Sequence, residues 1–422
     1  MSVVIDALVD RAQEALAAYA SFTQEQIDQI VRKASVAALS HHADLAVLAV
    51  EETRRGTFED KAVKNMFACE HVTNSIINQR TVGVISTDEL TGITEIADPV
   101  GVVCALTPVT NPTSTTIFKS LIALKTRNPI VFGFHPSAQR SSVSAATVVR
   151  DAAIAAGAPA DCIQWIEEPS MEASGELMNH PGVALILATG GNAMVRAAYS
   201  CGKPALGVGA GNVPAFIERT AKVGRAVNDI VISKSFDNGM VCASEQAVIL
   251  DAPIAKEALA EFARLHAYMA TPAEKRLLEE FIFGVAADSA DSANCADAKL
   301  NASVVGQSPV WIAQQAGFEV PADTSIILAE VSGVGPHEPL TREKLAPVLA
   351  VLHARNPQEG IDLAEQMVAF DGLGHSGAIH SNDPAVIADF ADRVKAVRIL
   401  ENAPSSLGGI GDIYNAFMPS LT

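Results

Sequence analysis

The sequence predicts an α/β protein in which parallel strands alternate with helices. Between residues 102 and 208, short apolar runs such as Val102–Leu106 and Ile130–Phe134 alternate with helical segments such as Ser114–Lys125 and Ser141–Ala156. Segments of this order and length are typical of a helix-covered parallel sheet. The composition agrees, because 49% of the 422 residues are hydrophobic and 18% are charged. A chain of this size is expected to form two or three domains.

The N-terminal region is expected to be helical, and a hairpin is expected to follow it. Thr23 and Gln26 form a capping-box pattern at the start of one of the helices in the first 80 residues. The segment Thr81–Ala97 is β-prone and interrupted by turn residues, which predicts a hairpin. In the alternating region, further strands are predicted at 163–166, 183–187 and 205–208, and helices at 171–178 and 192–199.

A second alternating region predicts a second α/β domain. The division is expected after Ser235, which gives domains 1–235 and 236–422. Residues 286–298 are small, acidic and serine-rich, and are expected to form a surface loop. The remaining elements are helices at 254–268, 272–283, 359–370 and 385–394, and strands at 326–328, 348–352 and 377–380.

Charge and cysteine usage exclude several classes of partner. A net charge of −18 argues against nucleic acid, which requires clustered Lys and Arg. No apolar run reaches transmembrane length, and the amphipathic start Met1–Ala20 is unlike a secretory signal. The six cysteines are scattered without a CxxC pair, which suits a reducing compartment. We therefore expect a soluble, cytoplasmic protein with no membrane partner.

The segment Ser233–Gln246 suggests a cysteine nucleophile. Asp237-Asn238-Gly239 predicts a turn with positive φ, and Ala247–Leu250 predicts the next strand. Cys242 lies between them, where a helix N-terminus would stabilise its thiolate through N–H groups and the helix dipole. The alternative is that Cys242 is a small buried hydrophobe.

Two glycine-rich segments are candidate cofactor loops. Gly190-Gly191 follows a predicted strand, so its backbone could approach a pyrophosphate at the start of the next helix, although such a pair also serves ordinary turns. Gly207–Asn212 lacks the third glycine of a dinucleotide fingerprint and is followed by Pro214, which favours a close-packed turn. Ligands are expected where the strands end, at Thr107–Pro112, His135–Ala138 and Thr189–Asn192.

Polar residues on other loops offer catalytic groups. Thr110 and Asn111 could donate to an oxyanion, or they could form an Asx-turn. His375 on the loop Gly372–His375 could exchange protons near pH 7, although a loop histidine usually faces solvent. Glu343 by itself would be a helix-start residue. The histidines show no metal-binding spacing, so no metal site is expected.

Together these segments resemble the aldehyde dehydrogenase superfamily. They are most similar to its CoA-acylating branch, as found in the aldehyde dehydrogenase half of bacterial bifunctional aldehyde–alcohol dehydrogenases. The stretches that carry the resemblance are 108–115, 118–128, 155–159, 185–191, 202–212, 236–246, 372–375 and 408–412. The resemblance implies the aldehyde dehydrogenase fold, with a Rossmann-like cofactor domain, an α/β catalytic domain and a small oligomerisation hairpin at about 81–97.

The resemblance also implies site residues and cofactors. Cys242 would be the nucleophile that forms a thioester, with NAD as hydride acceptor and coenzyme A as the thiol that takes the acyl group. Thr110 and Asn111, with the Cys242 N–H, would form the oxyanion hole, and His375 would handle protons. Glu343 would hold the nicotinamide ribose. The other cofactor-binding residues implied are Gly190, Gly191, His135, Ser137 and Gly209.

One departure from the family bears on the product. Hydrolytic members carry a glutamate that activates water, in a Leu-Glu-Leu-Gly-Gly stretch. The matching run here is Gly207–Gly211, with Val208 near the place of that glutamate. An apolar side chain cannot take a proton from water, so the thioester is expected to last until a thiol arrives. The expected partners are therefore a small aldehyde, acetaldehyde above all, and its acyl-CoA.

The bifunctional proteins continue beyond the segment that matches 419–422. A glycine-rich tail and an iron-dependent alcohol dehydrogenase follow there, so we expect that the C-terminal tail of the catalytic domain is missing. The hairpin suggests a homodimer or a higher homo-oligomer. Three alternatives stay open: a hydrolytic aldehyde dehydrogenase that forms a free acid, an inactive scaffold or filament subunit, and a reductase of acyl phosphates.

Overall fold

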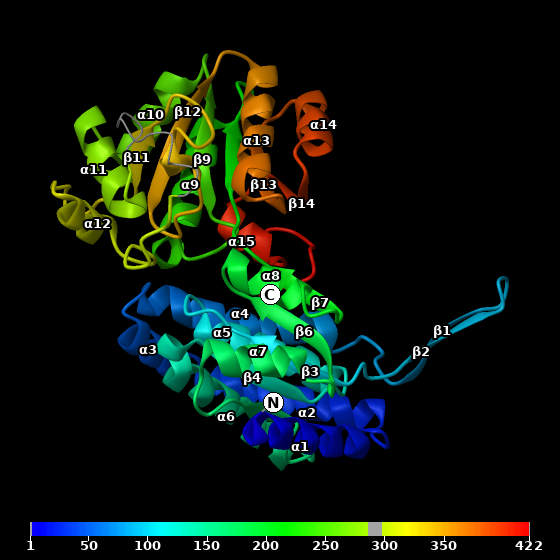
Figure 1. The fold of residues 1–422 in the computed structure, drawn as a ribbon. Helices are drawn as coiled ribbons and strands as arrows, with labels where there is room; N and C mark the ends of the chain where they lie inside the picture. The colour runs from blue at the N-terminus through cyan, green and yellow to red at the C-terminus, as the bar shows by residue number, and fades with distance from the viewer. Residues whose placement is uncertain (1, 286–297, 422) are drawn as a thin grey trace. The chain divides into compact units, whose positions relative to one another are not determined.

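The computed structural model describes residues 2–285 and 298–421, and its contacts divide the chain into two compact units. The first comprises residues 1–209 and 418–422, and the second comprises residues 210–417. The sequence places this division after Ser235. The contacts place it earlier because strand Val213–Ile217 (β8) and helix Val223–Ser235 (α9) belong to the sheet and core of the second unit. Each unit contains a parallel sheet, so the predicted α/β class is confirmed (Figure 1).

The sheet of the first unit has five parallel strands in the order β5-β4-β3-β6-β7. Its central strand, β3, pairs with β4 and β6, so the loops after these three strands leave the same edge of the sheet. All five strands were predicted, two of them with the observed bounds and three with an end that differs by one or two residues. They are Val102–Leu106 (β3), Ile130–Gly133 (β4), Ile163–Trp165 (β5), Val183–Thr189 (β6) and Ala205–Val208 (β7).

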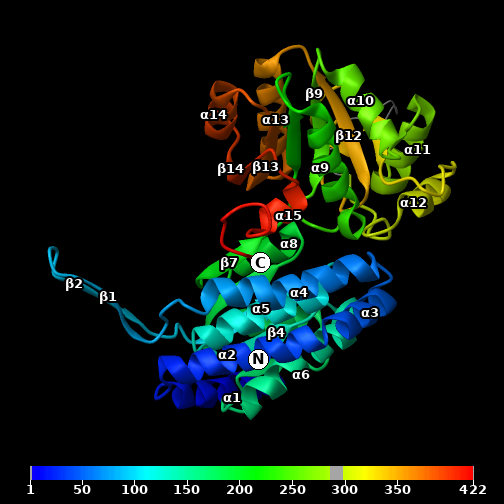
Figure 2. The ribbon, with the colours of Figure 1, turned by 180° about the vertical axis from the view of Figure 1, so that it is seen from behind.

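The helices of the first unit form two groups. The first group shares an apolar core with the sheet that includes Val9, Cys104 and Ile186, and consists of α1 (Val3–Tyr19), α7 (Met171–Asn179) and α8 (Asn192–Tyr199). The second group packs side by side (Figure 2). It consists of α2 (Gln24–Ser40), α3 (His42–Thr53), α4 (Phe58–Ile76), α5 (Pro112–Lys125) and α6 (Gln139–Ala155). The predicted capping box of Thr23 and Gln26 is present at the start of α2.

The predicted hairpin is formed by β1 (Gly83–Asp88) and β2 (Ile93–Ala97). The two strands are antiparallel and closed by a turn in which Gly92 has a φ of 69°, a conformation that favours glycine. The hairpin extends away from the rest of the first unit (Figure 1). Its apolar side chains are exposed, Ile93 at 57% and Ile96 at 63%.

The sheet of the second unit has seven parallel strands in the order β10-β11-β12-β9-β8-β13-β14. In addition to β8, these strands are β9 (Glu245–Asp251), β10 (Tyr268–Met269), β11 (Ile327–Glu330), β12 (Val348–Ala354), β13 (Gly374–His380) and β14 (Ala396–Glu401). Separate cores cover the two faces of the sheet. Besides α9, the helices are α10 (Ala255–Arg264), α11 (Pro272–Phe283), α12 (Pro309–Ala316), α13 (Pro357–Asp371), α14 (Pro384–Arg393) and α15 (Ser405–Ile410).

The second unit also shows where sequence patterns were insufficient. The helix predicted over 254–268 ends at Arg264, because His266 takes a φ of 61° and Tyr268 pairs with Ile327 as a strand. Strand β8 was not predicted, because residues 207–212 and Pro214 were interpreted as a close-packed turn. The register shift between Val213 and Pro214 accommodates the proline in a central strand. Elements β14, α12 and α15 were also missed. The loop predicted at 286–298 falls outside the described residues, except for its last residue.

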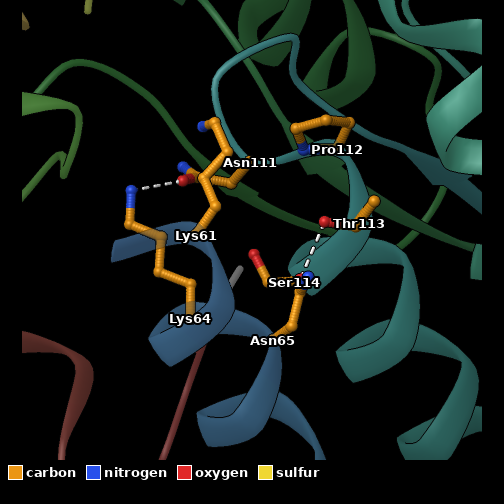
Figure 3. Close-up of a pocket in the computed structure, with 7 residues that line it drawn as sticks. All are labelled: Lys61, Lys64, Asn65, Asn111, Pro112, Thr113 and Ser114. Carbon is orange, nitrogen blue, oxygen red and sulfur yellow. Dashed lines mark hydrogen bonds between the residues drawn. The ribbon is translucent and has the colours of Figure 1, made fainter. Parts of the chain in front are cut away.

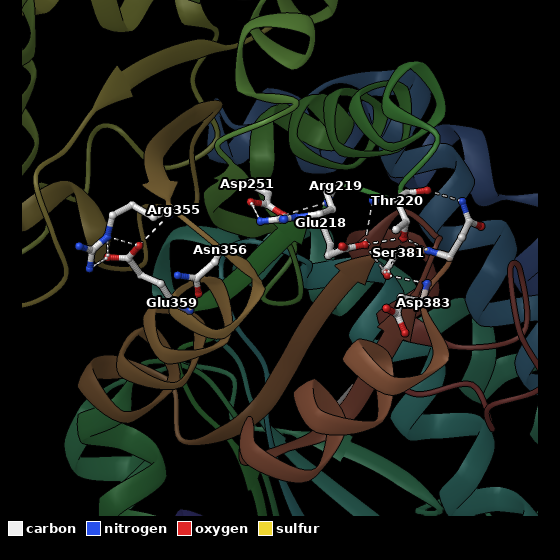
Figure 4. Close-up of polar contacts among 10 residues, drawn as sticks. Glu218, Arg219, Thr220, Asp251, Arg355, Asn356, Glu359, Ser381 and Asp383 are labelled. Atoms are coloured by element: carbon white, nitrogen blue, oxygen red, sulfur yellow. Dashed lines mark hydrogen bonds and ion pairs between the residues drawn. The ribbon is translucent and has the colours of Figure 1, made fainter.

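Polar contacts close the carboxyl edge of the second sheet (Figure 4). Arg219 follows β8 and makes a bidentate ion pair with the buried Asp251 at the end of β9, at 2.7 and 3.0 Å. Glu218 accepts from Ser381, which follows β13, at 2.8 Å. Arg355 follows β12 and pairs with Glu359 on α13. This edge is therefore occupied by contacts within the protein. None of the helices in the described parts of the chain combines the length and hydropathy needed to span a bilayer.

Candidate active site

Four loops of the second unit meet at the amino edge of its sheet. Gly211 precedes β8, Cys242 precedes β9, Glu343 precedes β12 and His375 is the second residue of β13. These strands are neighbours in the order β12-β9-β8-β13 and run parallel, so their amino ends share one edge. Ligands of open α/β sheets usually bind at the carboxyl edge. In this unit the candidate catalytic residues lie at the opposite edge.

The local backbone around Cys242 matches the sequence in part. Helix α9 ends at Ser235, and Asp237, Asn238 and Gly239 have φ values of 50°, 53° and 76°, so the predicted left-handed turn is confirmed. The predicted strand is confirmed as β9. The predicted helix N-terminus beside Cys242 is wrong, because the chain passes from a turn closed by the Ser244 N–H and the Val241 carbonyl directly into β9. A helix dipole therefore does not act on this thiol as the sequence predicted.

Gly211 determines how closely the loops approach one another. A Cβ atom on this residue would lie 2.0 Å from the carbonyl oxygen of Cys242 and 3.1 Å from Cδ2 of His375. Only glycine permits this backbone to lie so close to both residues. The sequence indicated a close-packed turn here without identifying its partners. The turn packs against the nucleophile candidate and the histidine candidate together.

Glu343 joins the same cluster through a backbone hydrogen bond. The Gly211 N–H donates to Glu343 Oε1 at 2.8 Å. Burial raises the pKa of the Glu343 carboxyl to about 7, while the Gly211 bond and the charge of His375 act in the opposite direction. Part of the residue remains open to solvent. Near neutral pH the group therefore exchanges between the acid and the carboxylate, and only the carboxylate can accept hydrogen bonds from both hydroxyls of a ribose.

His375 has the properties of a proton acceptor. Burial lowers the pKa of its imidazole, an effect that the charge of Glu343 opposes and that of Arg398 reinforces. The ring is therefore mainly neutral at pH 7, with one nitrogen able to take a proton. Nδ1 lies 3.1 Å from the hydroxyl of Ser376. The expectation that a loop histidine would face solvent does not hold here, because Gly211 packs against the ring.

Arg398 is a site residue that the sequence did not indicate. Burial lowers the pKa of its guanidinium, and its electrostatic interaction with Cys242 acts in the opposite direction. Its Nη1 donates to the carbonyl of Gly409. A nearby cation stabilises a thiolate, so Arg398 can supply the charge that the predicted helix dipole does not. It lies on β14, a strand that was not predicted, and it belongs to no sequence motif that would have indicated it.

A buried lysine connects the glutamate loop with the cysteine loop. Lys344 Nζ donates to the carbonyls of Leu340, Arg342 and Gln246 at 2.5, 2.9 and 3.1 Å. Its backbone N–H donates to Gln246 Oε1 at 3.1 Å. The residue is fully buried, so these bonds are shielded from water. They fix Glu343, which precedes Lys344, relative to β9, the strand that follows Cys242.

The first unit places the expected cofactor loops at the carboxyl edge of its own sheet. Gly190 and Gly191 lie between β6 and α8, and a Cβ atom on Gly191 would meet nothing within 4 Å. Among the described residues, the buried hydroxyl of Thr189 has no hydrogen-bond partner. Gly209 belongs to the same place, because its Cβ would lie 2.5 Å from Asn192 Oδ1 at the start of α8. The open backbone at Gly191, the N-terminus of α8 and the hydroxyl of Thr189 together would suit a pyrophosphate group.

His135 and Ser137 follow β4, next to β3 in the same sheet. The Ser137 N–H donates to His135 Nδ1 at 3.1 Å, so the proton of the neutral ring lies on Nε2 and can be donated to a ligand. Burial lowers the pKa of His135, and the charge of Arg55 adds to this effect. The ring is therefore a neutral donor at pH 7, as a ribose hydroxyl would require.

Thr110 and Asn111 follow β3 and are held by two lysines of α4. Figure 3 shows the bond from Lys64 to Asn111. Lys61 Nζ donates to the Thr110 carbonyl at 3.0 Å, and Lys64 Nζ donates to Asn111 Oδ1 at 2.8 Å. The structure thus brings the expected site residues together in two groups, one in each unit. Thr110, Asn111, Gly190, Gly191, His135, Ser137 and Gly209 lie in the first unit, and Cys242, Glu343 and His375 lie in the second.

The chain is similar to known proteins along almost its whole length. The model of the aldehyde dehydrogenase family matches residues 2–409. An aldehyde-alcohol dehydrogenase of Streptococcus pneumoniae serotype 4 is 64% identical over 418 residues, which cover 99% of this chain and 47% of that protein. The bifunctional aldehyde-alcohol dehydrogenase of Escherichia coli K12 is 46% identical over 422 residues, which cover 99% of this chain and 46% of that protein. This chain therefore spans about half the length of these relatives.

Two solved structures are similar over nearly their full length. An acetylating aldehyde dehydrogenase from Geobacillus thermoglucosidasius has a TM-score of 0.94 and 42% identity, covering 99% of this chain and 90% of that one. A propionaldehyde dehydrogenase from Rhodopseudomonas palustris, with bound CoA and an acylated cysteine, has a TM-score of 0.86 and 31% identity. The match covers 98% of this chain and 91% of that one.

Proposed function

Since this chain belongs to the aldehyde dehydrogenase family, we propose that it is a CoA-acylating aldehyde dehydrogenase. It interconverts acetaldehyde, or another short aldehyde, and its acyl-CoA, with NAD as cofactor and coenzyme A as co-substrate. The observation that carries the proposal is the packing of Cys242 and His375 against Gly211, which also binds Glu343.

In the proposed reaction Cys242 is the nucleophile. Its sulfur, as thiolate, forms a bond to the aldehyde carbon, while the negative charge that develops on oxygen is held by Thr110, Asn111 and the Cys242 N–H. NAD⁺, when bound, would supply the acceptor for the hydride that leaves the former aldehyde carbon. Cys242 then carries an acyl thioester. Arg398 favours the anionic form of the sulfur before the attack and again when it leaves.

Release of the acyl group requires a second thiol. His375, neutral at pH 7, takes the proton of the CoA thiol, whose sulfur then bonds to the acyl carbon as the Cys242 thiolate departs. The products are acyl-CoA, the reduced cofactor and one proton. Val208 lies near the place of the glutamate that activates water in hydrolytic members of the family, which supports transfer to a thiol over transfer to water.

Residues from both units are assigned to the cofactor. Gly190 and Gly191 leave backbone open for the pyrophosphate, and Gly209 lets the chain pass close to Asn192 beside them. His135 and Ser137 offer donors to the adenosine side, and Glu343 accepts from the nicotinamide ribose. We propose NAD rather than NADP. The charge of Arg55 near His135 makes a direct comparison of the two cofactors necessary, because a cation there would also suit a 2′-phosphate.

We further propose that two copies of the chain associate through the hairpin. Its apolar side chains Val84, Ile85, Ile93 and Ile96 are exposed on an element that extends from its own unit. Exposed apolar strands of this kind pair with another chain. The family resemblance favours a second copy of this chain as the partner that pairs with the hairpin. The five free cysteines in the described residues suit the reducing cytoplasm as the place of action.

The test is steady-state reduction of NAD⁺ by acetaldehyde, with and without CoA. The wild type should turn over only with CoA and should form acetyl-CoA, whereas Cys242→Ala should be inactive under both conditions. Free acid formed at full rate without CoA would identify a hydrolytic enzyme instead. A Cys242 that does not react with a mild thiol reagent, in a folded and inactive protein, would favour the scaffold alternative.

A further inference from the structure

Lys119 connects two neighbouring strands of the first sheet near their carboxyl ends. It lies on α5 and is fully buried, with 0% of its surface exposed. Its Nζ donates to the carbonyl of Leu106, the last residue of β3, at 2.7 Å and to the carbonyl of Leu187 on β6 at 2.9 Å. The Gly190-Gly191 loop begins three residues after Leu187, so this lysine is bonded to the strand that carries the loop.

Charge pairing does not explain a lysine at this position. No carboxylate in the described parts of the chain forms an ion pair with Lys119, and burial lowers the pKa of its ammonium to about 7, an effect that the electrostatic interaction with Cys104 opposes. Burial of a lysine carries a cost that an apolar side chain would avoid. The ammonium has three N–H donors and the neutral amine keeps two, so both forms can bind the two carbonyls. The residue therefore acts here through its hydrogen bonds.

The pairing of the two strands does not depend on Lys119. Strand β6 pairs with β3 along the whole length of β3, so the ladder is complete without the lysine. The lysine adds a link at the end of this ladder, where the chain leaves the sheet. Beyond it, the buried hydroxyl of Thr189 has no hydrogen-bond partner among the described residues, and a Cβ atom on Gly191 would meet nothing within 4 Å. Lys119 thus holds the start of a loop whose backbone is open to a ligand.

We infer that Lys119 is a positioning residue, which holds Leu187 at the end of β3 and thereby sets the Gly190-Gly191 loop for the pyrophosphate of the cofactor. The inference rests on the proposed function, in which this loop binds the pyrophosphate. All of these residues belong to the first unit. The first turn of α8 depends on the same loop, because two of its N–H groups donate to the carbonyl of Gly191 at 2.9 and 3.2 Å. A shift of the strand end would therefore move both the glycine backbone and the helix N-terminus.

The test compares two competitive inhibitors of NAD⁺ in the steady-state reduction assay. ADP carries a pyrophosphate group and adenosine does not. Lys119→Met should raise the Ki of ADP about tenfold, the scale of one well-placed hydrogen bond to a ligand, and leave the Ki of adenosine within about twofold. KM for NAD⁺ should rise with the Ki of ADP, whereas kcat at saturating NAD⁺, acetaldehyde and CoA should change by less than about twofold, as expected when only ground-state binding is lost.

The chain supplies a matched control on the same helix. Lys125 also lies on α5 and is 2% exposed, and its ammonium bonds to Asp28 and to the carbonyl of Ile77, which lie outside the two strands. Lys125→Met should lower the melting temperature to a similar extent but leave the Ki of ADP within about twofold of the wild type, because stability alone does not change the ligand affinity of the folded protein. Should Lys119→Met fail to fold, Lys119→Gln keeps N–H donors on a shorter side chain. It should raise the Ki of ADP to a smaller extent and again leave that of adenosine unchanged.

The outcomes separate the inference from the proposed function. An unchanged Ki of ADP in a folded Lys119 variant, an equal rise for adenosine, or an equal rise in Lys125→Met would each overturn the inference while the proposed function stands. A wild type that does not reduce NAD⁺ with acetaldehyde, with or without CoA, would overturn both. A rise for ADP alone, with kcat preserved, would support the inference.

Discussion

The main-chain N–H of Gly211 donates to Glu343 Oε1 at 2.8 Å, and the same glycine lies against the carbonyl of Cys242. One residue thus determines the spacing between the candidate nucleophile and the candidate cofactor-binding carboxylate. Both loops lie at the amino edge of the second sheet, while ion pairs and hydrogen bonds close the carboxyl edge.

A methyl group at Gly211 should disable the site. Gly211→Ala would place a Cβ 2.0 Å from the Cys242 carbonyl, so the loops must separate. Displacement of a reacting group by about 1 Å costs roughly 100-fold in rate, and we expect kcat to fall by at least this factor. Gly224→Ala is the control, because nothing lies within 4 Å of its Cβ position. Equal activity of the two variants in the steady-state assay would contradict the prediction.

Binding of NAD⁺ should strengthen as pH rises through 7. The pKa of Glu343 is raised to about 7, so the carboxylate that accepts from the ribose forms mainly above that pH. KM for NAD⁺ should therefore fall between pH 6 and pH 8, by up to about tenfold per pH unit below the pKa, as follows from a single titrating group. Glu343→Gln should have a higher and nearly constant KM. A variant with the same pH profile as the wild type would assign the titration to another group.

His380 should make the second unit sensitive to acid. It is the last residue of β13, at the edge opposite to Cys242, and its buried Nε2 has no hydrogen-bond partner in the described part of the chain. Burial and the charge of Arg225 lower its pKa from 6.5 to about 4. Protons therefore bind preferentially to the unfolded chain in this interval, and the free energy of unfolding falls as pH falls.

The size of the acid effect can be measured by difference. Between pH 6.5 and pH 4 the contribution of His380 amounts to about 3 kcal/mol. Urea unfolding of the wild type and of His380→Leu at several pH values isolates it. The stability of the variant should decline less steeply over this range. Parallel curves for the two proteins would show that His380 does not carry the effect.

A charge on the hairpin should change the oligomeric state without destabilising the chain. Ile96 is 63% exposed, so Ile96→Lys removes little buried surface from a single copy. A charge on an apolar strand opposes pairing with a second chain. Sedimentation should show smaller species for this variant and an unchanged melting temperature. Val36→Lys on α2, at 61% exposed, is the control and should keep the state of the wild type.

The sequence by itself determined the class of fold and most of its elements. Alternation of apolar runs and helices predicted all five strands of the first sheet, because a strand buried on both faces leaves a continuous apolar run. Local signals, a turn before Cys242 and a glycine-rich loop around His375, also indicated these two residues as separate candidates, whereas Glu343 became a candidate only through the family resemblance. Strand β8 was missed because Pro214 was interpreted as part of a close-packed turn, and Tyr268 was assigned to a helix because strand pairing with Ile327 is not local.

Only the tertiary structure decided which of these residues meet and what sets their chemistry. Neighbouring strands in the order β12-β9-β8-β13 come from distant parts of the chain, so no spacing in the sequence places Gly211 beside Cys242 or Arg398 within electrostatic reach of it. The pKa of Glu343 depends on burial, and the direction of the Asn111 amide depends on a lysine from another helix. Residue type and local pattern are written in the sequence, whereas proximity and desolvation arise when the chain folds.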